Sequence, residues 1–337
     1  MTDSPTLSDV ASLAGVSIKT VSRVVNGEPG VTPAKAKRVH DAVRALGYRP
    51  NPLARSLRTG RDEAVGLVVE RIGDPFFAAL TEAVEEAARE AGLFLIIASA
   101  GESAGQERAV ILGLLHRSVC GLIARPCLLD YSSEDLSIGV GGVPIVFVDC
   151  PPGRVNADTV LVDNVESARR ATSHLISFGH RRIAFVGTAL DRLPLRWRLE
   201  GYRAALAEAG IACDGDLVVS HERSADGHPP FVGPLLRLER PPTAVLSANA
   251  VTSLEVVAEI HGAGRTDIAF VSFDDFPMAG SLTPAVTVAR QDPALMGRTA
   301  MDLLLQRIRG DSSAPRHVVL PTAFVARGSG EIGPGSR

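Results

Sequence analysis

The apolar positions along the chain follow two different patterns. In the first fifty residues they recur at helical spacing, as at Leu7, Val10 and Ala14. From residue 63 onward they form short continuous runs, such as AVGLVV and DIAFVSF, separated by longer amphipathic segments. Continuous runs of this length are typical of strands buried in a parallel sheet. We therefore predict a small all-α N-terminal domain followed by a larger α/β region.

Residues 6–26, TLSDVASLAGVSIKTVSRVVN, predict two short helices joined by a tight turn. Thr6 and Asp9 have the spacing of a capping box at the start of the first helix, and Gly15 ends that helix. Ser17 can cap the second helix, which follows directly. Two helices in this arrangement form a helix-turn-helix, whose second helix can lie in the major groove of DNA.

The N-terminal end of the second helix carries side chains suited to base reading. Ile18, Lys19 and Thr20 form its first turn, and Arg23 follows one turn later. An arginine can donate two hydrogen bonds to guanine, while a small aliphatic side chain can contact a thymine methyl group. A helical hairpin with a merely solvated polar face is the alternative interpretation.

Strands and helices alternate beyond residue 63, which predicts two doubly wound parallel-sheet lobes. The expected strands are AVGLVV, LFLIIAS, GLIAR, PIVFVD, RIAFVG, DLVVS, TAVLSA and DIAFVSF. The expected helices cover about 75–90, 105–115, 167–178, 196–209 and 252–261. Ligands of such sheets bind beyond the carboxyl ends of the strands. Asp149, Asn249 and Asp274 follow strands directly, so each can line a ligand site or simply cap the next segment.

Formal charge is divided unevenly between the two regions. The first sixty residues hold nine basic and four acidic side chains, a charge of +5, which leaves −8 for the other 277 residues. The chain's three lysines, Lys19, Lys35 and Lys37, all lie in this head. A basic head on an acidic body is typical of a DNA-binding domain attached to a domain with another task.

Several other functions fit the sequence less well. No lysine follows Lys37, which excludes a P-loop or Schiff-base lysine from the α/β region, and GxSxG and HExxH are absent. The four cysteines have no metal-ligand spacing and predict reduced thiols in a cytoplasmic protein. No apolar run reaches about eighteen residues, and the N-terminus has no signal-peptide pattern. We expect no enzyme, cofactor, metal ion or membrane partner.

Two alternatives remain open from the residues alone. A secreted solute-binding protein would have the two lobes but would leave the basic head unexplained. A hydrolase that uses aspartate and arginine would leave the helix-turn-helix unexplained.

The run DVASLAGVSIKTVSRVVNG, continued by VTPAKAKRVHDAVRALGYRPNPLARSLRTG, resembles the N-terminal domain of the LacI family of bacterial transcription regulators. The resemblance implies a helix-turn-helix DNA-binding domain over residues 1–50, with a third helix that begins at Thr32-Pro33. It also implies that Ile18, Lys19 and Arg23 read bases. The DNA-binding residues expected in this domain are Ser17, Ile18, Lys19, Thr20, Arg23 and Asn26.

Residues 51–61 would read as a plain linker in an unknown protein, but the resemblance implies a hinge helix that orders on specific DNA. Leu57 stands where the family inserts a leucine from each subunit into the minor groove and kinks the duplex. Ala54 beside it is small enough for close approach, and Arg58 completes the expected hinge contacts with DNA.

For residues 62–330 the resemblance implies a periplasmic-binding-protein-like domain for effector binding and dimerisation. Lobe 1 would comprise about 62–161 and 293–319, and lobe 2 about 162–291 and 320–329. The glycine-rich tail, 331–337, is expected to be disordered. The expected effector-binding residues are Asp74, Phe76, Asp149, Arg196, Asn249, Asp274 and Gln291.

Asp74 and Phe76 belong to the sequence Gly73-Asp74-Pro75-Phe76-Phe77, which is similar to a family signature, and Arg196 stands at the family's effector-contacting arginine position. Carboxylates, amides and an arginine around a cleft suit a polyhydroxylated ligand. The chain departs from the family pattern where Ala250 follows Asn249 in place of an aspartate, which argues against transferring a named sugar.

We predict a ligand-responsive, sequence-specific DNA-binding regulator. The favoured form is a homodimeric repressor of carbohydrate uptake or catabolism genes that binds an inverted-repeat operator and is controlled by a small sugar-like effector. The alternative is an activator or a corepressor-dependent regulator with a purine or other non-sugar effector. The sequence does not reveal the effector, the operator or the direction of the response.

Overall fold

The computed structural model describes residues 5–25, 28–48, 63–101, 103–117, 119–126, 142–153, 155–190, 192–221 and 229–335. The chain divides into two compact units, residues 1–62 and 63–337. Four residues with an expected DNA contact lie outside the described ranges: Asn26, Ala54, Leu57 and Arg58. None of the described helices is long and apolar enough to cross a membrane.

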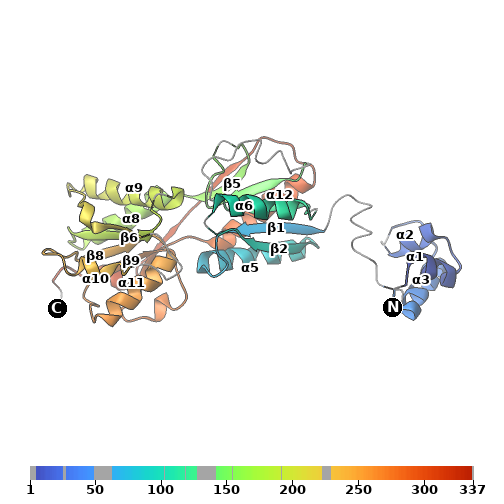
Figure 1. Cartoon of the computed structure of the whole chain (residues 1–337), viewed down its shortest axis with the longest axis horizontal. Coiled ribbons are helices and arrows are strands. Elements are labelled where there is room, and N and C mark those ends of the chain that lie inside the picture. The colour runs from blue at the N-terminus through green and yellow to red at the C-terminus, as the bar shows by residue number, and fades with distance from the viewer. Residues whose placement is uncertain are drawn as a thin grey trace. The chain divides into compact units, whose positions relative to one another are not determined.

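The described part of the first unit contains the three expected helices, α1 (Leu7–Ala14), α2 (Ile18–Val25) and α3 (Pro33–Leu46) (Figure 1). The predicted capping box is present, because Thr6 Oγ1 accepts from Asp9 N at 3.3 Å and Asp9 Oδ2 accepts from Thr6 N at 2.8 Å. Gly15 adopts the left-handed conformation, φ 61°, and ends α1. Val10, Val21 and Val39 are fully buried, so each helix contributes to one small core.

The described residues of the second unit form two six-stranded sheets, one in each lobe (Figure 1). The first sheet has the order β11-β5-β4-β3-β1-β2, and the second has the order β12-β10-β9-β8-β6-β7. All neighbouring strands are parallel except β12, which runs antiparallel to β10. The two orders correspond position by position, so β4 and β9 occupy equivalent places.

The strand bounds are as follows. The first sheet comprises β1 (Ala64–Val69), β2 (Phe94–Ser99), β3 (Gly121–Ala124), β4 (Ile145–Val148), β5 (Asp158–Val162) and β11 (His317–Leu320). The second comprises β6 (Ile183–Thr188), β7 (Val218–His221), β8 (Ala244–Ser247), β9 (Ala269–Phe273), β10 (Thr287–Arg290) and β12 (Ala323–Val325). The central strands β1, β3, β8 and β9 are buried throughout, as their continuous apolar runs predicted.

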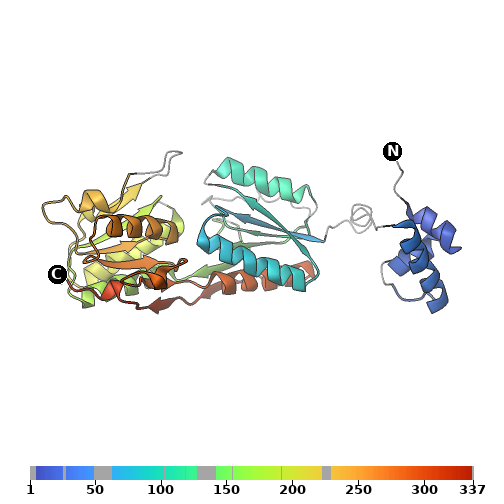
Figure 2. The ribbon, with the colours of Figure 1, turned by 90° about the horizontal axis from the view of Figure 1, so that it is seen from below.

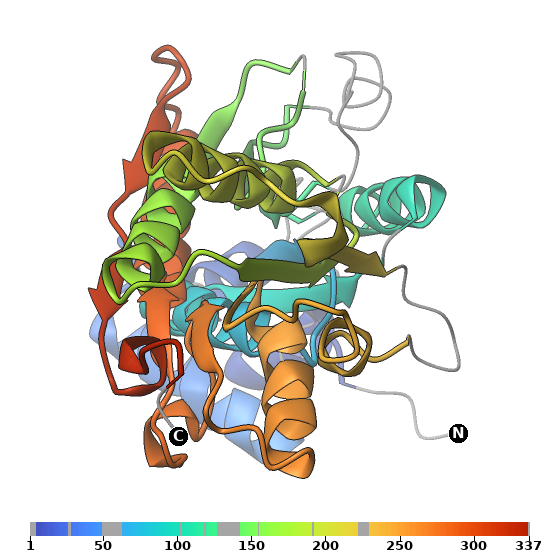
Figure 3. The ribbon, with the colours of Figure 1, turned by 90° about the vertical axis from the view of Figure 1, so that its left-hand side faces the viewer.

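Helices cover both faces of each sheet (Figures 1 and 2). The first lobe has α5 (Pro75–Glu90), α6 (Ala104–Leu115) and α12 (Pro293–Ile308). The second has α8 (Asn164–Ser177), α9 (Leu193–Glu208), α10 (Val232–Leu235) and α11 (Ala250–Gly262), with short 3-10 helices η1 (Gly215–Leu217), η2 (Ala279–Ser281) and η3 (Ser329–Glu331). Helices α5 and α12 pack side by side, and so do α8 and α9 (Figures 2 and 3).

Over the described residues the chain crosses between the lobes three times, in the segments 162–164, 290–293 and 320–323, here called the crossing segments. They lie close together. Ser167 Oγ, at the start of α8, is 2.5 Å from Thr322 Oγ1, and Arg170 Nη2 donates to the Thr322 carbonyl at 3.1 Å. The second and third crossing segments line one shared surface depression.

The prediction that residues 331–337 are disordered is wrong for the part that the structure describes. Glu331 Oε2 accepts from Thr287 Oγ1 at 2.9 Å, and its Oε1 lies 2.5 Å from His174 Nε2. The Ile332 carbonyl accepts from His180 Nε2 at 2.7 Å. A Cβ on Gly330 would lie 2.9 Å from a Val271 methyl group, so this glycine allows close packing onto the second lobe.

Candidate functional site

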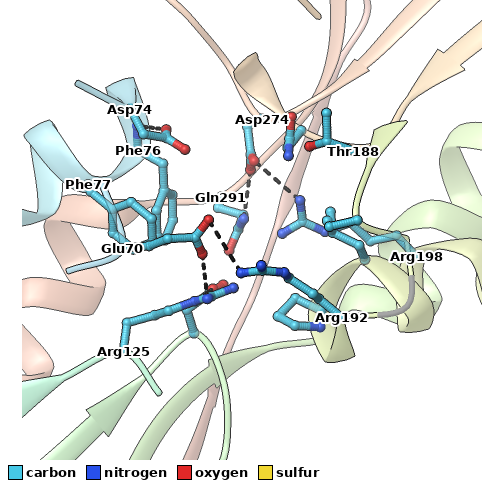
Figure 4. Close-up of a pocket in the computed structure, with 15 residues that line it drawn as sticks. Glu70, Asp74, Phe76, Phe77, Arg125, Thr188, Arg192, Arg198, Asp274 and Gln291 are labelled. Carbon is cyan, nitrogen blue, oxygen red and sulfur yellow. Dashed lines mark hydrogen bonds and ion pairs between the residues drawn. The ribbon is translucent and has the colours of Figure 1, made fainter. Parts of the chain in front are cut away.

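A cavity lies between the two lobes, with about 540 Å³ of empty space that includes open solvent (Figure 4). Its walls come from helices α5 and α9 and from residues at the carboxyl ends of strands in both sheets, the usual place for a ligand in open parallel sheets. The lining residues are Glu70, Asp74, Phe76, Phe77, Arg125, Asp149, Thr188, Ala189, Arg192, Pro194, Leu195, Arg198, Asn249, Asp274 and Gln291.

Six of the seven expected effector residues line this cavity: Asp74, Phe76, Asp149, Asn249, Asp274 and Gln291. Arg196 does not, and its side chain is exposed. Helix α9 begins at Leu193, three residues earlier than expected, and its apolar face contains Leu195, Leu199 and Tyr202. Arg198 lies on that inward face and is 3 % exposed, whereas Arg196 lies about 200° around the helix from it.

Arg198 is held by three neighbours in the second lobe. Its Nε donates to Asn164 Oδ1 at 2.8 Å, and its Nη1 donates to the Ala248 carbonyl at 2.7 Å and to Asp274 Oδ2 at 3.3 Å. The guanidinium carbon lies 3.8 Å from the centroid of the Phe273 ring, within cation–π range. Nη2 makes no hydrogen bond to any residue that the structure describes, so it can donate to a ligand.

Asp274 follows β9 with φ 70°, in the left-handed region, and is buried. Burial raises its pKa, although Arg198 and a 2.6 Å hydrogen bond from Gln291 Nε2 to Oδ1 act in the opposite direction. The Gln291 side chain is 4 % exposed, and its Oε1 has no hydrogen-bond partner among the described residues. This buried acceptor therefore calls for a donor from a ligand or from water.

Asp149 is the counterpart of Asp274 in the first lobe. It follows β4, the strand equivalent to β9, and also has positive φ, 64°. The amide of Asp149 donates to the Val160 carbonyl at 3.0 Å, just as that of Asp274 donates to Ala289 at 2.9 Å. Left-handed backbone outside glycine is uncommon and clusters at functional sites. The two lobes thus present an aspartate to the cavity in the same way.

An arginine and a glutamate that were not among the expected site residues complete the first-lobe wall. Arg125 follows β3, donates from Nε to Asp149 Oδ2 at 3.2 Å and contacts the Glu70 carboxylate through Nη1. Glu70 follows β1 and also lies 3.8 Å from Arg192 Nη1, across the cavity in the second lobe. Glu70 therefore interacts with both walls (Figure 4).

Asp74 is the N-cap of α5, and its Oδ1 accepts from Phe76 N at 2.9 Å. Its pKa is raised to about 6, first by burial and then by the carboxylates of Asp274, Glu70 and Asp149. The backbone hydrogen bond lowers the pKa but is outweighed.

Nine cavity residues were not among the expected set. They are Glu70, Phe77, Arg125, Thr188, Ala189, Arg192, Pro194, Leu195 and Arg198. Position after a strand was a usable signal for Glu70 and Arg125, and position at the end of a strand for Thr188. The apolar periodicity of α9 was a usable signal for Arg198.

The second candidate surface is the start of α2 in the first unit. Ser17 Oγ accepts from Thr20 N at 3.2 Å and so caps the helix, as predicted. Ile18 is 52 % exposed, and Lys19 is also exposed. Arg23 is partly exposed, and its Nε lies 3.9 Å from Glu28 Oε2. Since Val21 anchors the opposite face in the core, these side chains are held on one exposed surface.

Comparison with known proteins gives matches over both units. Residues 6–51 match the model of bacterial regulatory proteins of the lacI family, and residues 172–330 match the model of a periplasmic binding protein-like domain. The HTH-type transcriptional regulator CelR of Thermobifida fusca is 35 % identical over 341 residues, covering 97 % of this chain and 98 % of the relative.

Two solved structures are also similar over nearly the whole chain. A complex of the transcriptional regulator CelR with cellobiose has a TM-score of 0.70 at 33 % identity, covering 96 % of this chain and 99 % of that one. A lac repressor dimer bound to operator and the anti-inducer ONPF has a TM-score of 0.82 at 25 % identity, covering 97 % and 99 %. The chain therefore belongs to the lacI family of bacterial regulatory proteins.

Proposed function

We propose that this chain is a repressor of carbohydrate uptake or catabolism genes whose DNA binding is controlled by a sugar-like effector in the cavity between the lobes. The observation that carries this proposal is the convergence of carboxylates, amides and guanidinium groups from both lobes on one cavity. Such groups match hydroxyls that both donate and accept hydrogen bonds. A relative in the same family has been solved with cellobiose, which supports the ligand class.

The site also supports coupling between ligand and DNA. A ligand that touches Asp74 in the first lobe and Arg198 or Asn249 in the second favours one arrangement of the lobes over others. The DNA-binding unit joins the first lobe just before β1, so we propose that the lobe arrangement controls residues 51–61. Coupling of this kind is reciprocal and is typically worth about 1–3 kcal/mol, or about 5- to 150-fold in affinity.

On the DNA side, we propose a homodimer that reads an inverted repeat with two copies of α2. Ile18, Lys19 and Arg23 are assigned to bases, and Ser17, Thr20 and Asn26 to further DNA contacts. An exposed ion pair such as Arg23–Glu28 is worth little, so Arg23 can leave it for guanine. Ala54, Leu57 and Arg58 are assigned to the hinge contacts. The chain acts in the cytoplasm as a regulator rather than as an enzyme.

The proposal for the cavity is tested by titrating effector against operator-bound protein. The effector is found first, by a thermal-shift screen of sugars, polyols and purines, since a ligand of the native state raises its melting temperature. Arg198→Lys keeps the charge beside Asp274 but loses the planar fork of donors. Arg196→Ala is the matched control on the same helix.

We expect Arg196→Ala to respond like wild type. Arg198→Lys should bind operator normally but need about tenfold more effector, a loss of about 1.4 kcal/mol. If Arg198→Lys releases operator at the wild-type effector concentration, the effector does not bind in this cavity.

A further inference from the structure

The charges around the cavity do not balance. Among the described residues, four carboxylates and three guanidinium groups line it. The carboxylates belong to Glu70, Asp74, Asp149 and Asp274, and the guanidinium groups to Arg125, Arg192 and Arg198. With all seven ionised, the cavity carries one excess negative charge.

Every one of the three guanidinium groups already has a carboxylate beside it. Arg125 contacts Glu70 and lies 3.2 Å from Asp149, Arg192 lies 3.8 Å from Glu70, and Arg198 lies 3.3 Å from Asp274. Asp74 is the cavity carboxylate that has no basic side chain within 4.0 Å among the residues described. Asp74 is therefore the cavity carboxylate that no described basic side chain neutralises directly.

The surroundings of Asp74 destabilise its anionic form. Phe76 N donates one hydrogen bond to it, and the helix N-terminus favours an anion. Burial and three neighbouring carboxylates outweigh the Phe76 hydrogen bond, and the pKa of Asp74 rises to about 6. A positive charge placed beside Asp74 would relieve this repulsion, whereas a neutral hydroxyl would leave the excess charge in the site.

A second and independent group in the cavity also needs a donor. Gln291 Oε1 is buried without a hydrogen-bond partner among the described residues, because the amide nitrogen of the same side chain is turned toward Asp274. Figure 4 shows the Gln291 amide beside Asp274, between the walls of the two lobes. A buried acceptor left without a donor is costly, because it has lost its hydrogen bonds to water. The Asp74 carboxylate and Gln291 Oε1 can therefore both accept a hydrogen bond from a ligand.

We propose that the effector is an amino sugar, whose ammonium group binds Asp74 and whose hydroxyl group donates to Gln291 Oε1. This inference rests on the proposed effector role of the cavity and narrows its ligand class. A neutral sugar can satisfy Gln291 but brings no charge to Asp74. An acidic sugar would add a second excess negative charge.

The two ligand classes differ in their response to pH. An ammonium group binds the ionised form of Asp74, and with a pKa of about 6 that form falls from about nine-tenths at pH 7 to about one-tenth at pH 5. The affinity for an amino sugar should then fall about tenfold between these pH values. A neutral sugar can donate to the carboxylate or accept from the carboxylic acid, so its affinity should not fall in this way.

The experiment compares matched ligands on the purified full-length protein by isothermal titration calorimetry. The pairs are glucosamine with glucose, galactosamine with galactose, and the disaccharide of two glucosamine units with cellobiose. N-acetylglucosamine is a further control, because it keeps the nitrogen but has no charge. Asp74→Asn removes the carboxylate while an asparagine can still cap α5. Glu82→Gln removes an exposed carboxylate from the same helix and is the matched control.

We expect the amino member of at least one pair to bind at least tenfold more tightly than its neutral partner and than the N-acetyl control. Asp74→Asn should abolish this preference, and Glu82→Gln should keep it. The inference is overturned if no amino member binds, if the neutral members bind as tightly, or if Asp74→Asn keeps the preference. A neutral sugar that releases operator in an Arg198-dependent manner would leave the proposed function intact while overturning the inference.

Discussion

Gly201, in the middle of α9, allows the backbone of α9 to approach α8 closely. A methyl group added at Gly201 would lie 2.1 Å from the Val165 carbonyl oxygen, 2.9 Å from Arg169 N and 3.0 Å from Ala168 Cβ. Ordinary carbon–oxygen contacts are about 3.3 Å or longer. In Gly201→Ala the two helices must therefore separate by roughly 1 Å, because a backbone carbonyl cannot rotate away as a side chain can.

The magnitude follows from two opposing effects. Alanine is favoured over glycine in a helix by about 1 kcal/mol, whereas overpacking a well-filled core costs about 1–3 kcal/mol and occasionally more. Since the obstruction is backbone, we place the packing cost at the upper end and expect a net loss of about 2 kcal/mol in the free energy of unfolding. A loss of that size lowers the melting temperature of a body of this size by about 4–8 °C.

The measurement is urea unfolding followed by tryptophan fluorescence. Trp197 is the chain's single tryptophan and lies on α9, so the signal reports the affected lobe. Gly262→Ala is the control, because a Cβ at that last residue of α11 meets nothing within 4 Å. It should be neutral or stabilising by up to about 1 kcal/mol. A Gly201→Ala protein as stable as wild type would show that the close approach of α8 and α9 is wrong.

Three further outcomes are expected. The pKa of Asp74 is raised in the folded state, so the ionisation of Asp74 lowers the stability of the protein as pH rises through about 6. Asp74→Asn should therefore be more stable than wild type by up to about 3 kcal/mol at pH 8. In thermal melts this advantage should vanish below about pH 4. Arg23→Ala should lose about 1–3 kcal/mol of binding free energy on the specific operator, whereas Lys35→Ala should weaken binding to all DNA sequences alike. If Arg23→Ala lost equal binding free energy on specific and on random DNA, that result would contradict base reading by Arg23. Glu331→Ala should lower the free energy of unfolding by about 1–3 kcal/mol because Thr287 and His174 lose their partner, and an unchanged value would contradict the docked tail.

The regular elements were predictable because their signals are local. A run such as AVGLVV becomes the fully buried β1, and the helix expected over 75–90 is α5 with the same bounds. Six cavity residues could also be predicted, because the end of a buried strand is a place that the sequence marks.

The remaining parts depend on tertiary packing. The expected helix start at 196 left Leu195 outside α9; with the helix begun at Leu193, the apolar positions Leu195, Leu199 and Tyr202 place Arg198 on the inward face. The ion pairs of Arg125 join residues far apart in sequence, so no local pattern indicates them. Glycine content suggested disorder for the tail, but in the structure Gly330 permits close contact with Val271.

The three crossing segments bear on how members of such a family diversify. The second and third segments pair at Arg290 and Ala323, and the third is hydrogen-bonded to the start of α8, so together the segments favour bending of the lobes about a common axis. A ligand can therefore set how far the lobes close but hardly the direction in which they move. Substitutions among the cavity residues can then change the chemical signal that is recognised without redesigning the movement delivered at β1. Ligand recognition and the movement at β1 can thus change independently of each other. A few substitutions in the walls of the cavity can therefore adapt the same two-lobed domain to a different ligand.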